Sequence, residues 1–389
     1  MSVNQNFHFI VKTQAGLEQL LAEELTALGA TKVQVLQRAV KCVGDSRLMY
    51  RINYASRLAL RVLKEVMTFE APDERALYQE VKQFNWPSVL DSGQTLAVHA
   101  TVNNSRMTHS HFVALKTKDA IVDSFRDKTG RRPDVDVQNP DMLVQIHING
   151  MRGTLLLDSS GDSLHKRGYR TKQGTAPINE VLAAGMIRLT GWDGNSPLLD
   201  PMCGSSTIPC EAVMIALNMP AGYFRKDFGF MHWNDFDPDL WKKLKEEENA
   251  KISKQPVEIF GYDVNQNALA LADEIVRNAG FEKYITLKQV AFENSKPPME
   301  MPGYIITNPP YGERIKKEDI LAFYRMIGDT LKSRYAGYSA WLITAHMDAL
   351  KSVGLRTSKK IKLYNGPLEC RFVKYEMYRG SRKKGQEKE

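Results

Sequence analysis

Residues 303–314 are Gly-Tyr-Ile-Ile-Thr-Asn-Pro-Pro-Tyr-Gly-Glu-Arg, a short apolar run followed by two consecutive prolines. Tyr304 to Thr307 are mostly aromatic or β-branched, which is typical of a buried strand. Proline donates no hydrogen bond to a sheet and restricts the residue before it, so the chain must leave the sheet in an extended, rigid loop. Ligands of open α/β sheets bind beyond the carboxyl ends of the strands. We therefore expect a ligand site at Asn308 to Tyr311.

The residue types of this loop suit an exocyclic amine on a nucleobase. Such an amine is a poor nucleophile because its lone pair is delocalised into the ring. The side-chain oxygen of Asn308 and the carbonyl oxygen of Pro309 are two acceptors that can hold the amine hydrogens and direct the lone pair. Tyr311 can stack on a base that has left its helix. A proline-rich turn that only ends a strand has the same residues, so the rest of the chain must decide.

Two earlier strands end in an acidic residue, as in nucleotide-binding sheets. Leu198-Leu199 runs into Asp200-Pro-Met-Cys-Gly-Ser-Ser-Thr207, a turn of small residues before an apolar helix. Glu258 to Asp263 repeats the arrangement, and an acid at the end of a second strand is placed to bind the two ribose hydroxyls of a nucleoside. With a third strand at Ile285 to Val290, the sequence predicts a Rossmann-like α/β sheet with four strand ends at one edge.

The first 160 residues predict an α+β region with a ferredoxin-like β-α-β start. Apolar residues alternate in short strands and recur at helical spacing between them, and Asn149-Gly150 is a strong hairpin turn signal. After the loop at residues 303–314, a helix, a strand and a final hairpin follow. The other elements that the pattern predicts are strands at Phe7–Lys12, Lys32–Val43, Thr95–Val102 and Tyr338–Thr344, and helices at Leu17–Leu28, Asp73–Phe84, Phe112–Asp127, Ala176–Arg188, Ile208–Leu217, Asn265–Ala279 and Ile320–Leu331.

Composition limits the class of protein. The 389 residues suffice for two or three domains, and 43% hydrophobic and 25% charged residues are ordinary for a soluble protein. A formal net charge of +8 favours a polyanionic partner such as nucleic acid. The four cysteines form no Cys-x-x-Cys pair, and His109 and His111 lack an evident third ligand, so no disulfide or metal is expected. Without a signal sequence or a membrane-length apolar run, we expect a cytoplasmic protein with no membrane partner.

Two groups of motifs resemble a known family. The run from His111 to Arg126, with Gly130-Arg-Arg-Pro133 and Leu155-Leu-Leu-Asp158, is similar to the THUMP domain, an RNA-binding module. With Asp200-Pro-Met-Cys-Gly204 and the loop at residues 303–314, the chain resembles the THUMP-containing RNA guanine-N2 methyltransferases over nearly its whole length. The resemblance is strongest to those acting on 23S ribosomal RNA. It implies a class I Rossmann-like methyltransferase domain that uses S-adenosylmethionine.

The resemblance also assigns residues and domains. Asn308, Pro309 and Tyr311 would hold the target base as the catalytic residues. The implied cofactor contacts are Asp200, Pro201, Cys203, Gly204, Thr207, Phe292 and, for the ribose, Asp263. The basic residues expected to bind RNA are Lys116, Lys118, Arg126, Arg131, Lys166, Arg167 and Arg170. The expected domains are a ferredoxin-like segment at 1–50, a THUMP domain at 51–160, a linker at 161–175, a methyltransferase domain at 176–380 with an insertion at 219–255, and a disordered tail at 381–389.

Three features depart from the family pattern or stay open. The family has Gly-Ser-Gly-Thr where this chain has Gly204-Ser-Ser-Thr207, and we expect the second serine to be tolerated unless its position requires a positive φ. The third strand ends in Val290-Ala-Phe-Glu-Asn294 and offers no aspartate to the adenine ring, so Phe292 or Glu293 would contribute instead. The insertion at 219–255 would form either a helical cluster over the sheet edge or a lid that stacks on nucleotides.

The expected reaction is methyl transfer to the exocyclic N2 amine of a guanine in structured RNA, either 23S ribosomal RNA or a pre-50S particle. Positioning would supply most of the catalysis, and no strong base is needed because the amine loses its proton readily once it is cationic. Adenine-N6 methylation of RNA or DNA is the nearest alternative. An inactive RNA-binding or ribosome-assembly factor, with Ser206 and Ala291 as its signature, is another, and methylation of protein glutamine amides is a third.

Overall fold

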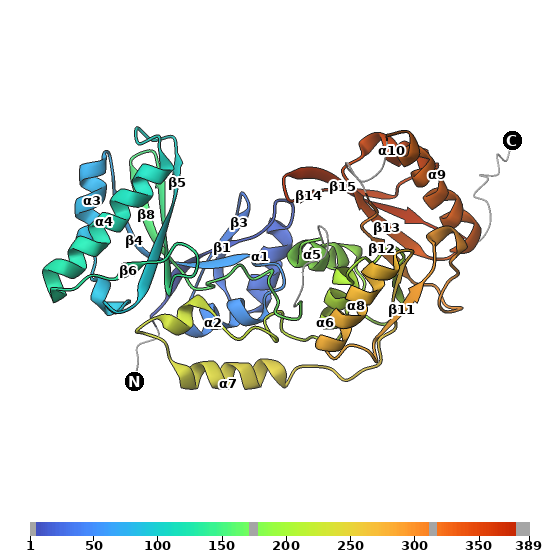
Figure 1. The fold of residues 1–389 in the computed structure, drawn as a ribbon, viewed down its shortest axis with the longest axis horizontal. Helices are drawn as coiled ribbons and strands as arrows, with labels where there is room; N and C mark the ends of the chain where they lie inside the picture. Colours follow the sequence, from blue (N-terminus) through green and yellow to red (C-terminus); the bar gives the residue numbers. More distant parts are fainter. Residues whose placement is uncertain (1–4, 171–177, 311–316, 379–389) are drawn as a thin grey trace, which may run out of the picture. The chain divides into compact units, whose positions relative to one another are not determined.

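The structure is a computed structural model that describes residues 5–170, 178–310 and 317–378 (Figure 1). The chain divides into two compact units, and each unit draws on separate stretches of the sequence. Unit 1 comprises Met1–Thr13, Glu18–Gly168 and Pro220–Ala250, and unit 2 comprises Gln14–Leu17, Tyr169–Met219 and Lys251–Glu389.

Unit 1 is built on one eight-stranded sheet with the order β2-β3-β1-β4-β8-β7-β5-β6. Its strands are β1 (Phe7–Lys12), β2 (Thr31–Leu36), β3 (Ala39–Gly44), β4 (Arg61–Glu70), β5 (Thr95–Asn103), β6 (Asp134–Val135), β7 (Met142–Asn149) and β8 (Arg152–Asp158). Its α-helices are α1 (Glu18–Ala27), α2 (Ser46–Ala55), α3 (Glu74–Gln83), α4 (Ser110–Thr129) and α7 (Pro238–Asn249). In Figure 1, α3 and α4 lie side by side against the part of the sheet that contains β4, β5 and β7.

The long strand β4 joins the ferredoxin-like and THUMP-like parts into a single sheet. Leu63 of β4 is paired with Ile10 of β1 on one side and with Asp158 of β8 on the other. The domain boundary expected between residues 50 and 51 falls inside α2. The two regions therefore share one continuous set of backbone hydrogen bonds.

Local signals explain most of the elements of unit 1. The side chain of Asp73 caps α3 by accepting a hydrogen bond from the backbone N–H of Ala76, and α4 ends at Gly130 with a φ of 69°. The predicted hairpin at Asn149-Gly150 is confirmed as β7 and β8. The prediction of one strand at Lys32–Val43 was wrong, because Arg38 adopts a φ of 57° and turns the chain back on itself between β2 and β3.

The insertion packs into unit 1 through aromatic side chains. Trp241 of α7 is buried, and its ring contacts Tyr50 and Tyr54 of α2 with centroid distances of 6.1 and 5.3 Å. The ring of Phe230 is stacked on Tyr50 at 4.4 Å, and Phe228 is equally buried. These rings are core residues of unit 1. The hypothesis that the aromatic residues of the insertion form a nucleotide-stacking lid is therefore wrong for these side chains.

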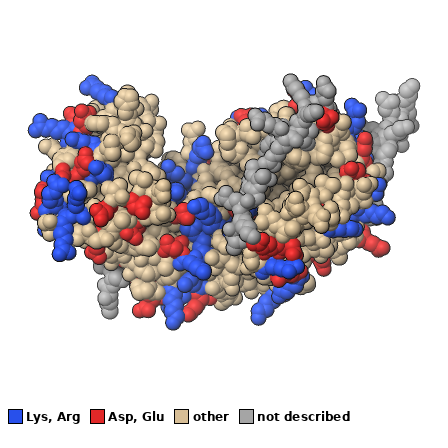
Figure 2. All heavy atoms as spheres, viewed as in Figure 1, with Lys and Arg blue, Asp and Glu red and all other residues tan. Residues whose placement is uncertain are grey.

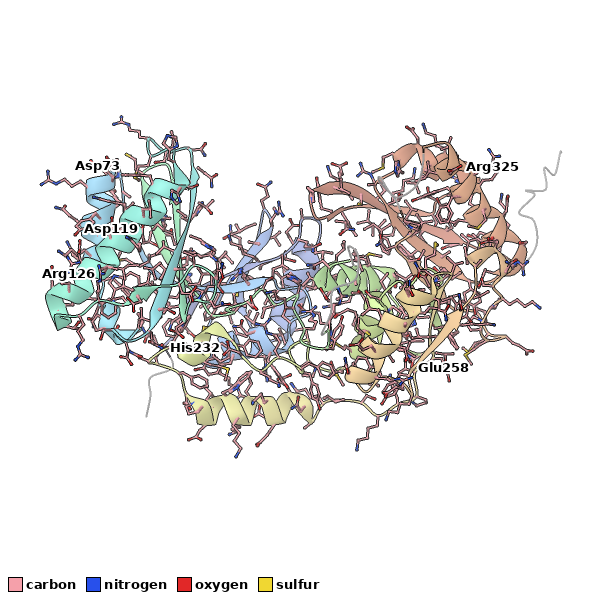
Figure 3. The ribbon with its side chains drawn as sticks, viewed as in Figure 1. Asp73, Asp119, Arg126, His232, Glu258 and Arg325 are labelled. Carbon is pink, nitrogen blue, oxygen red and sulfur yellow. The ribbon has the colours of Figure 1, made fainter. Side chains whose placement is uncertain are left out.

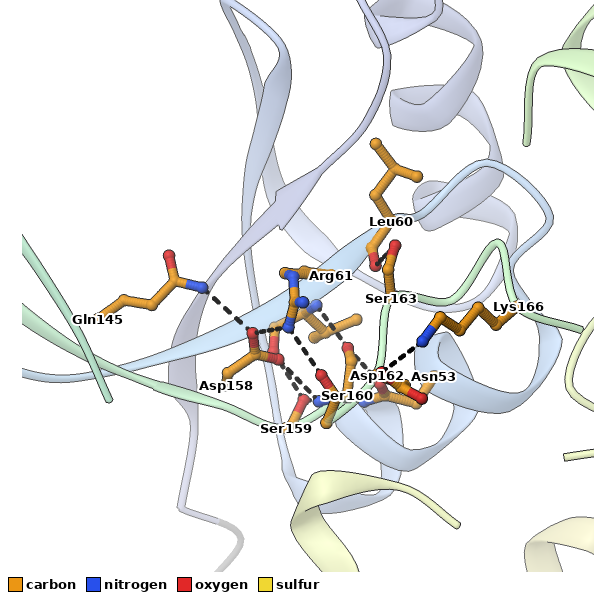
Figure 4. A network of polar contacts seen from close by, with 12 residues as sticks. Asn53, Leu60, Arg61, Gln145, Asp158, Ser159, Ser160, Asp162, Ser163 and Lys166 are labelled. Carbon is orange, nitrogen blue, oxygen red and sulfur yellow. Dashed lines mark hydrogen bonds and ion pairs between the residues drawn. The ribbon is translucent and has the colours of Figure 1, made fainter. Parts of the chain in front are cut away.

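Buried polar contacts fix the segment that follows β8 (Figure 4). The fully buried carboxylate of Asp158 accepts hydrogen bonds from Arg61 at 2.6 Å and from Gln145 at 3.1 Å. Burial raises the pKa of Asp158, and the nearby Arg61 guanidinium opposes this shift. Arg225 from the insertion donates to the backbone carbonyls of residues 160, 162, 163 and 166. The first part of the expected linker is thus ordered, because its backbone carbonyls are hydrogen-bonded to the guanidinium of Arg225.

Unit 2 has a seven-stranded sheet with the order β11-β10-β9-β12-β13-β15-β14, which confirms the Rossmann-like prediction. The first five strands in this order are parallel, and β15 runs antiparallel to β13. Its strands are β9 (Leu198–Asp200), β10 (Ile259–Asp263), β11 (Ile285–Gln289), β12 (Tyr304–Thr307), β13 (Ser339–Thr344), β14 (Lys359–Asn365) and β15 (Leu368–Glu376). Its helices are α5 (Glu180–Thr190), α6 (Thr207–Ala216), α8 (Gln266–Asn278), α9 (Lys317–Arg334), α10 (Met347–Ser352) and the short 3-10 helix η3 (Phe292–Asn294).

The sheet of unit 2 is covered on both faces. Leu199, Phe260 and Ile305 share a core cluster with Tyr324 and other buried residues of α9. Alternate strand residues point to the opposite face, where α6 contacts β9 and β10. Helix α5 begins at Glu180, with the extended residue Asn179 as its cap, so the helix predicted from Ala176 starts later than expected. Ala176 itself lies outside the described residues.

For cysteines, metal sites and membrane spans, the structure gives observations on the described residues alone. All four cysteines are buried, and no disulfide bond joins any two of them. Among residues 5–170, 178–310 and 317–378, no cluster of three potential metal-ligating side chains occurs. No helix in these ranges combines the length and apolar character that a membrane span needs.

Candidate active site

A cavity of about 1270 Å³ lies at the carboxyl ends of β9, β10 and β12 in unit 2. The structure brings nearly all predicted cofactor and base residues to its wall. The predicted residues that line the cavity are Asp200, Pro201, Cys203, Gly204, Thr207, Asp263, Phe292, Asn308 and Pro309. Tyr311 lies outside the described residues. Residues from separate strands thus meet at one edge, as the order of the motifs predicts.

The loop between β9 and α6 contains two left-handed residues in a tight turn. Gly204 has a φ of 53°, and Ser206, the N-cap of α6, has a φ of 60° and a ψ of 31°. A Cβ atom built at Gly204 meets no atom within 4 Å, so the backbone itself borders the cavity there. The family glycine replaced by Ser206 is therefore at a position of positive φ, where a side chain costs about 1–2 kcal/mol.

Asp263 connects the second strand to the loop of the first. Its Oδ2 atom accepts a hydrogen bond from the backbone N–H of Gly204 at 2.9 Å, and its Oδ1 atom accepts one from the N–H of Asn265 at 2.9 Å. Asp263 is partly exposed and lines the cavity. A carboxylate has about four lone-pair sites, so two acceptor sites remain for a diol such as the ribose of the cofactor.

Asp200 has a buried carboxyl group that lies between the loop after β9 and the loop after β12. Its Oδ1 atom accepts hydrogen bonds from the Thr307 hydroxyl at 2.7 Å and from the backbone N–H of Met202 at 3.2 Å. The pKa of Asp200 is raised to about 7, mainly by burial and also by the charge of Asp263, while the two hydrogen bonds oppose this shift. The carboxyl group is therefore held close to the boundary between its neutral and ionised forms at neutral pH.

Asn308 directly follows β12, and its side-chain oxygen is a hydrogen-bond acceptor without a donor among the described residues. Its Oδ1 atom is buried and has no hydrogen-bond partner within the described part of the chain. A buried, unsatisfied acceptor costs about 1–3 kcal/mol, so native proteins rarely keep one without a function. Asn308 and the neighbouring Pro309 line the same cavity as Gly204 and Asp263. This acceptor is therefore placed to bind a donor group of a ligand.

The end of the third strand offers two different surfaces to the cavity. The ring of Phe292 is buried and stacks on Tyr335 at a centroid distance of 5.6 Å, as part of the core under α9. Glu293 is exposed and also lines the cavity. A polar contact to an adenine amine is thus open to Glu293, whereas Phe292 mainly supports the cavity floor.

Sequence reasoning missed one wall of the cavity. This wall comes from α9 and from the turn between β14 and β15, which are distant in sequence from the motifs. Its residues are Phe323, Met326, Asn365, Gly366 and Leu368. The apolar spacing of α9 indicated a helix but gave no signal that Phe323 and Met326, which pack against the core, also line the cavity.

The predicted RNA-binding residues differ in their surroundings. Arg126 and Arg131 are exposed, Lys116 and Lys118 are partly exposed, and Lys166 is exposed. Arg126 and Asp119, both labelled in Figure 3, lie on α4. In Figure 2, basic and acidic side chains are interspersed over the surface that α3 and α4 form. These five residues are accessible, but a single uninterrupted basic patch is not seen there.

Two of the linker arginines have internal partners. Arg167 is only 2% exposed and donates to the carbonyls of Leu164 and Arg57, so in this conformation its guanidinium does not face solvent as an RNA-binding residue would. Arg170 is hydrogen-bonded to the Thr207 hydroxyl and lies 3.4 Å from Glu180. Its guanidinium therefore supports the start of α6 instead of facing solvent. Glycine-rich, basic sequence suggested an exposed linker and gave no sign of these partners.

Comparison with known families assigns three regions of the chain. Residues 167–374 match the RMKL-like methyltransferase domain, residues 71–158 the THUMP domain and residues 8–63 the RlmL ferredoxin-like domain. The chain belongs to the RMKL-like methyltransferase family. Membership confirms the predicted methyltransferase fold and, at the level of the family, the predicted cofactor S-adenosylmethionine.

Similar proteins cover nearly the whole chain. The putative RNA methyltransferase slr0064 of Synechocystis is 40% identical over 93% of this chain and 95% of its own length. The ribosomal RNA large subunit methyltransferase K/L of Methylococcus capsulatus is 37% identical over 95% of this chain, which spans 51% of that longer protein. The crystal structure of the putative methyltransferase SMU.472 in complex with SAH has a TM-score of 0.87 and 29% identity, and covers 97% of this chain and 100% of that one.

Proposed function

We propose that this RMKL-like methyltransferase transfers the methyl group of S-adenosylmethionine to the exocyclic N2 amine of a guanine in 23S ribosomal RNA. The observation that carries the chemistry is the buried Asn308 Oδ1 atom, which has no partner in the described chain. It lines the same cavity as the loop between β9 and α6, which we call the cofactor loop. The RNA substrate is supported by the THUMP match and by the names of the relatives that act on RNA.

The residues of the first two strand ends fit the cofactor. Asp263 retains acceptor sites for the ribose hydroxyls, and Gly204 leaves open space where a side chain would intrude. Glu293 can accept a hydrogen bond from the adenine amine. When bound, S-adenosylmethionine supplies an electrophilic methyl group. The cavity of about 1270 Å³ is large enough to hold both a nucleoside-sized cofactor and a flipped base.

Asn308 and Pro309 would orient the acceptor amine. The Asn308 oxygen takes one amine hydrogen and the Pro309 carbonyl takes the other, which directs the nitrogen lone pair away from the ring plane and toward the methyl donor. The buried Asn308 oxygen has no partner in the described part of the chain and would gain one from the base, so binding the base would recover the cost of leaving it unsatisfied. Most of the rate enhancement comes from this orientation.

The THUMP region would supply binding to the RNA backbone. Lys116, Lys118, Arg126, Arg131 and Lys166 are accessible, and neutralising phosphates with such residues gives affinity that falls with salt. We leave Arg167 and Arg170 out of this role because both form internal hydrogen bonds. We expect the first group to contribute to RNA affinity and not to the methyl-transfer step.

Nucleoside mass spectrometry of ribosomal RNA tests the proposal. The 23S RNA from cells that lack this protein should have lost one N2-methylguanosine, and the wild-type gene should restore it while an Asn308→Ala gene should not. Loss of N6-methyladenosine instead would replace the guanine assignment with adenine. An unchanged nucleoside profile, together with no binding of S-adenosylmethionine at high micromolar concentration, would indicate an inactive RNA-binding factor.

A further inference from the structure

Thr307 and Asp200 form the connection between the two loops of the candidate active site. Thr307 ends β12 and is 3% exposed, and Asp200 ends β9 and is 2% exposed. The Thr307 hydroxyl donates to Asp200 Oδ1 at 2.7 Å. Asn308 is the next residue after Thr307, and the cofactor loop begins directly after Asp200.

The backbone ladder between these strands ends before it reaches the two residues. The register pairs Tyr304 with Leu198 and Ile305 with Leu199. Asp200 is paired instead with Gly261 of β10, and Thr307 with Leu342 of β13. Beyond Ile305, the side-chain hydrogen bond therefore continues the connection between β9 and β12 where their ladder has stopped.

One oxygen atom joins the two loops. Asp200 Oδ1 accepts from the backbone N–H of Met202, in the cofactor loop, as well as from the hydroxyl of Thr307. A displacement of either loop would lengthen one of these two hydrogen bonds. The same atom thus limits the relative movement of the loop after β9, which would hold the methyl donor, and of Asn308, which would hold the acceptor amine.

We propose that Thr307 is a positioning residue that sets the distance between the acceptor amine and the methyl donor through Asp200. This inference rests on the function proposed above and adds a residue outside the assigned base and cofactor contacts. Reacting atoms must approach to roughly 3–3.5 Å, and a misplacement of about 1 Å can cost roughly 100-fold in rate. A residue that fixes the two loops relative to each other therefore acts on turnover more than on the binding of either ligand.

Thr307→Val tests this role because it keeps the β-branched shape and removes only the hydroxyl. Thr307→Ser is the rescue variant, since it keeps the hydroxyl. Thr344→Val is the control: Thr344 is also a buried threonine at the end of a strand, β13, and its hydroxyl accepts hydrogen bonds from the Tyr324 hydroxyl at 2.6 Å and from the backbone N–H of His346 at 3.0 Å, with no contact to Asp200. Both valine variants lose one buried hydroxyl, and Thr344→Val loses the larger number of hydrogen bonds, so a general loss of stability would slow it at least as much as Thr307→Val.

The measurements are single-turnover transfer of labelled methyl to ribosomal RNA, calorimetric affinity for S-adenosylmethionine, and the melting temperature. Thr307→Val should be slowed about 10- to 100-fold with cofactor affinity within about threefold of wild type, Thr307→Ser should recover most of the rate, and Thr344→Val should stay within about threefold. A Thr307→Val rate matching that of Thr344→Val would overturn the positioning role alone. Absence of any methyl transfer by the wild type would overturn the proposed function and this role with it.

Discussion

The carboxylate of Asp263 accepts a hydrogen bond from the backbone N–H of Gly204 at 2.9 Å, which joins the ends of β10 and β9. The residue that we propose binds the ribose of the cofactor thus also holds the loop after β9, on which we propose that the cofactor lies. Cofactor binding and loop geometry are therefore two properties of one side chain.

Asp263→Ala should lower the affinity for S-adenosylmethionine at least tenfold, because the ribose loses its acceptor and Gly204 loses its partner. A tenfold change in affinity corresponds to about 1.4 kcal/mol. Isothermal titration calorimetry measures this effect. Asp273→Ala is the control, since Asp273 is a surface residue of α8 paired with Arg277 at 2.8 Å. Equal affinities in both variants would contradict the assignment of Asp263.

Asn308→Ala should reduce methyl transfer at least about 100-fold, while the affinity for S-adenosylmethionine stays within a factor of about three. The reason is that its oxygen is the proposed acceptor for the amine, whereas the backbone N–H groups of Gly204 and Met202 in the loop after β9 donate to Asp263 and Asp200. Single-turnover transfer to ribosomal RNA gives the rate. Asn308→Asp retains an oxygen at the same place and should be less impaired, and normal turnover by the alanine variant would remove Asn308 from the mechanism.

Ser206→Gly should stabilise the protein by about 0.5–1 kcal/mol. Relief of the left-handed conformation at a φ of 60° gains about 1–2 kcal/mol, and the extra flexibility of glycine in the unfolded chain offsets part of this gain. Chemical denaturation measures the free energy of unfolding. Ser205→Gly is the matched control, since the neighbouring Ser205 has no positive φ and its replacement should be destabilising. The same sign for both variants would contradict this explanation.

Asp200→Asn should change how stability depends on pH. The folded-state pKa of Asp200, about 7, exceeds the ordinary value of 3.8, so the folded protein holds the proton over a pH range in which the unfolded chain has released it. Stability of the wild type relative to the variant should therefore fall as pH rises from about 4 to about 7, by at most about 4 kcal/mol. Melting temperatures across this range test the slope, and parallel curves for the two proteins would contradict it.

Trp241→Ala should destabilise unit 1 by about 3–5 kcal/mol, because a large buried ring between Tyr50 and Tyr54 is lost. Differential scanning calorimetry should show a lowered transition for unit 1, while that of unit 2 is less affected. Leu240→Ala, at the preceding and partly exposed position of the same helix, should cost much less. Equal effects of the two changes would contradict the core role of Trp241.

Sequence patterns predicted what depends on local periodicity. The strands that end at Asp200, Asp263 and Thr307 were found because each is a short apolar run followed by a recognisable turn, and parallel strands bring such ends to one edge. Asn308 and Gly204 were found for the same reason. The left-handed conformation of Arg38 was not predictable, because arginine carries no turn signal.

Contacts between distant segments could not be read from the sequence. Trp241 lies in an insertion within the methyltransferase sequence, yet its ring packs against Tyr50, almost two hundred residues earlier. Arg167 has the residue type and the glycine-rich neighbours of an exposed linker, and only the fold shows that its guanidinium is buried. The cavity wall formed by Phe323 escaped notice because a helical period does not reveal what covers each face.

The membership of Pro220–Ala250 in unit 1 has a consequence for the history of the gene. A single recombination event at residue 168 or 169 would deliver the catalytic unit together with the insertion but without Tyr50 and Tyr54, leaving Trp241 and its neighbouring rings without their packing partners. A protein in which the segment before residue 168 had been exchanged for another sequence would therefore fold less stably and be lost by selection. The two units are expected to be inherited as a pair, and changes in the rings of α2 should be accompanied by changes in α7.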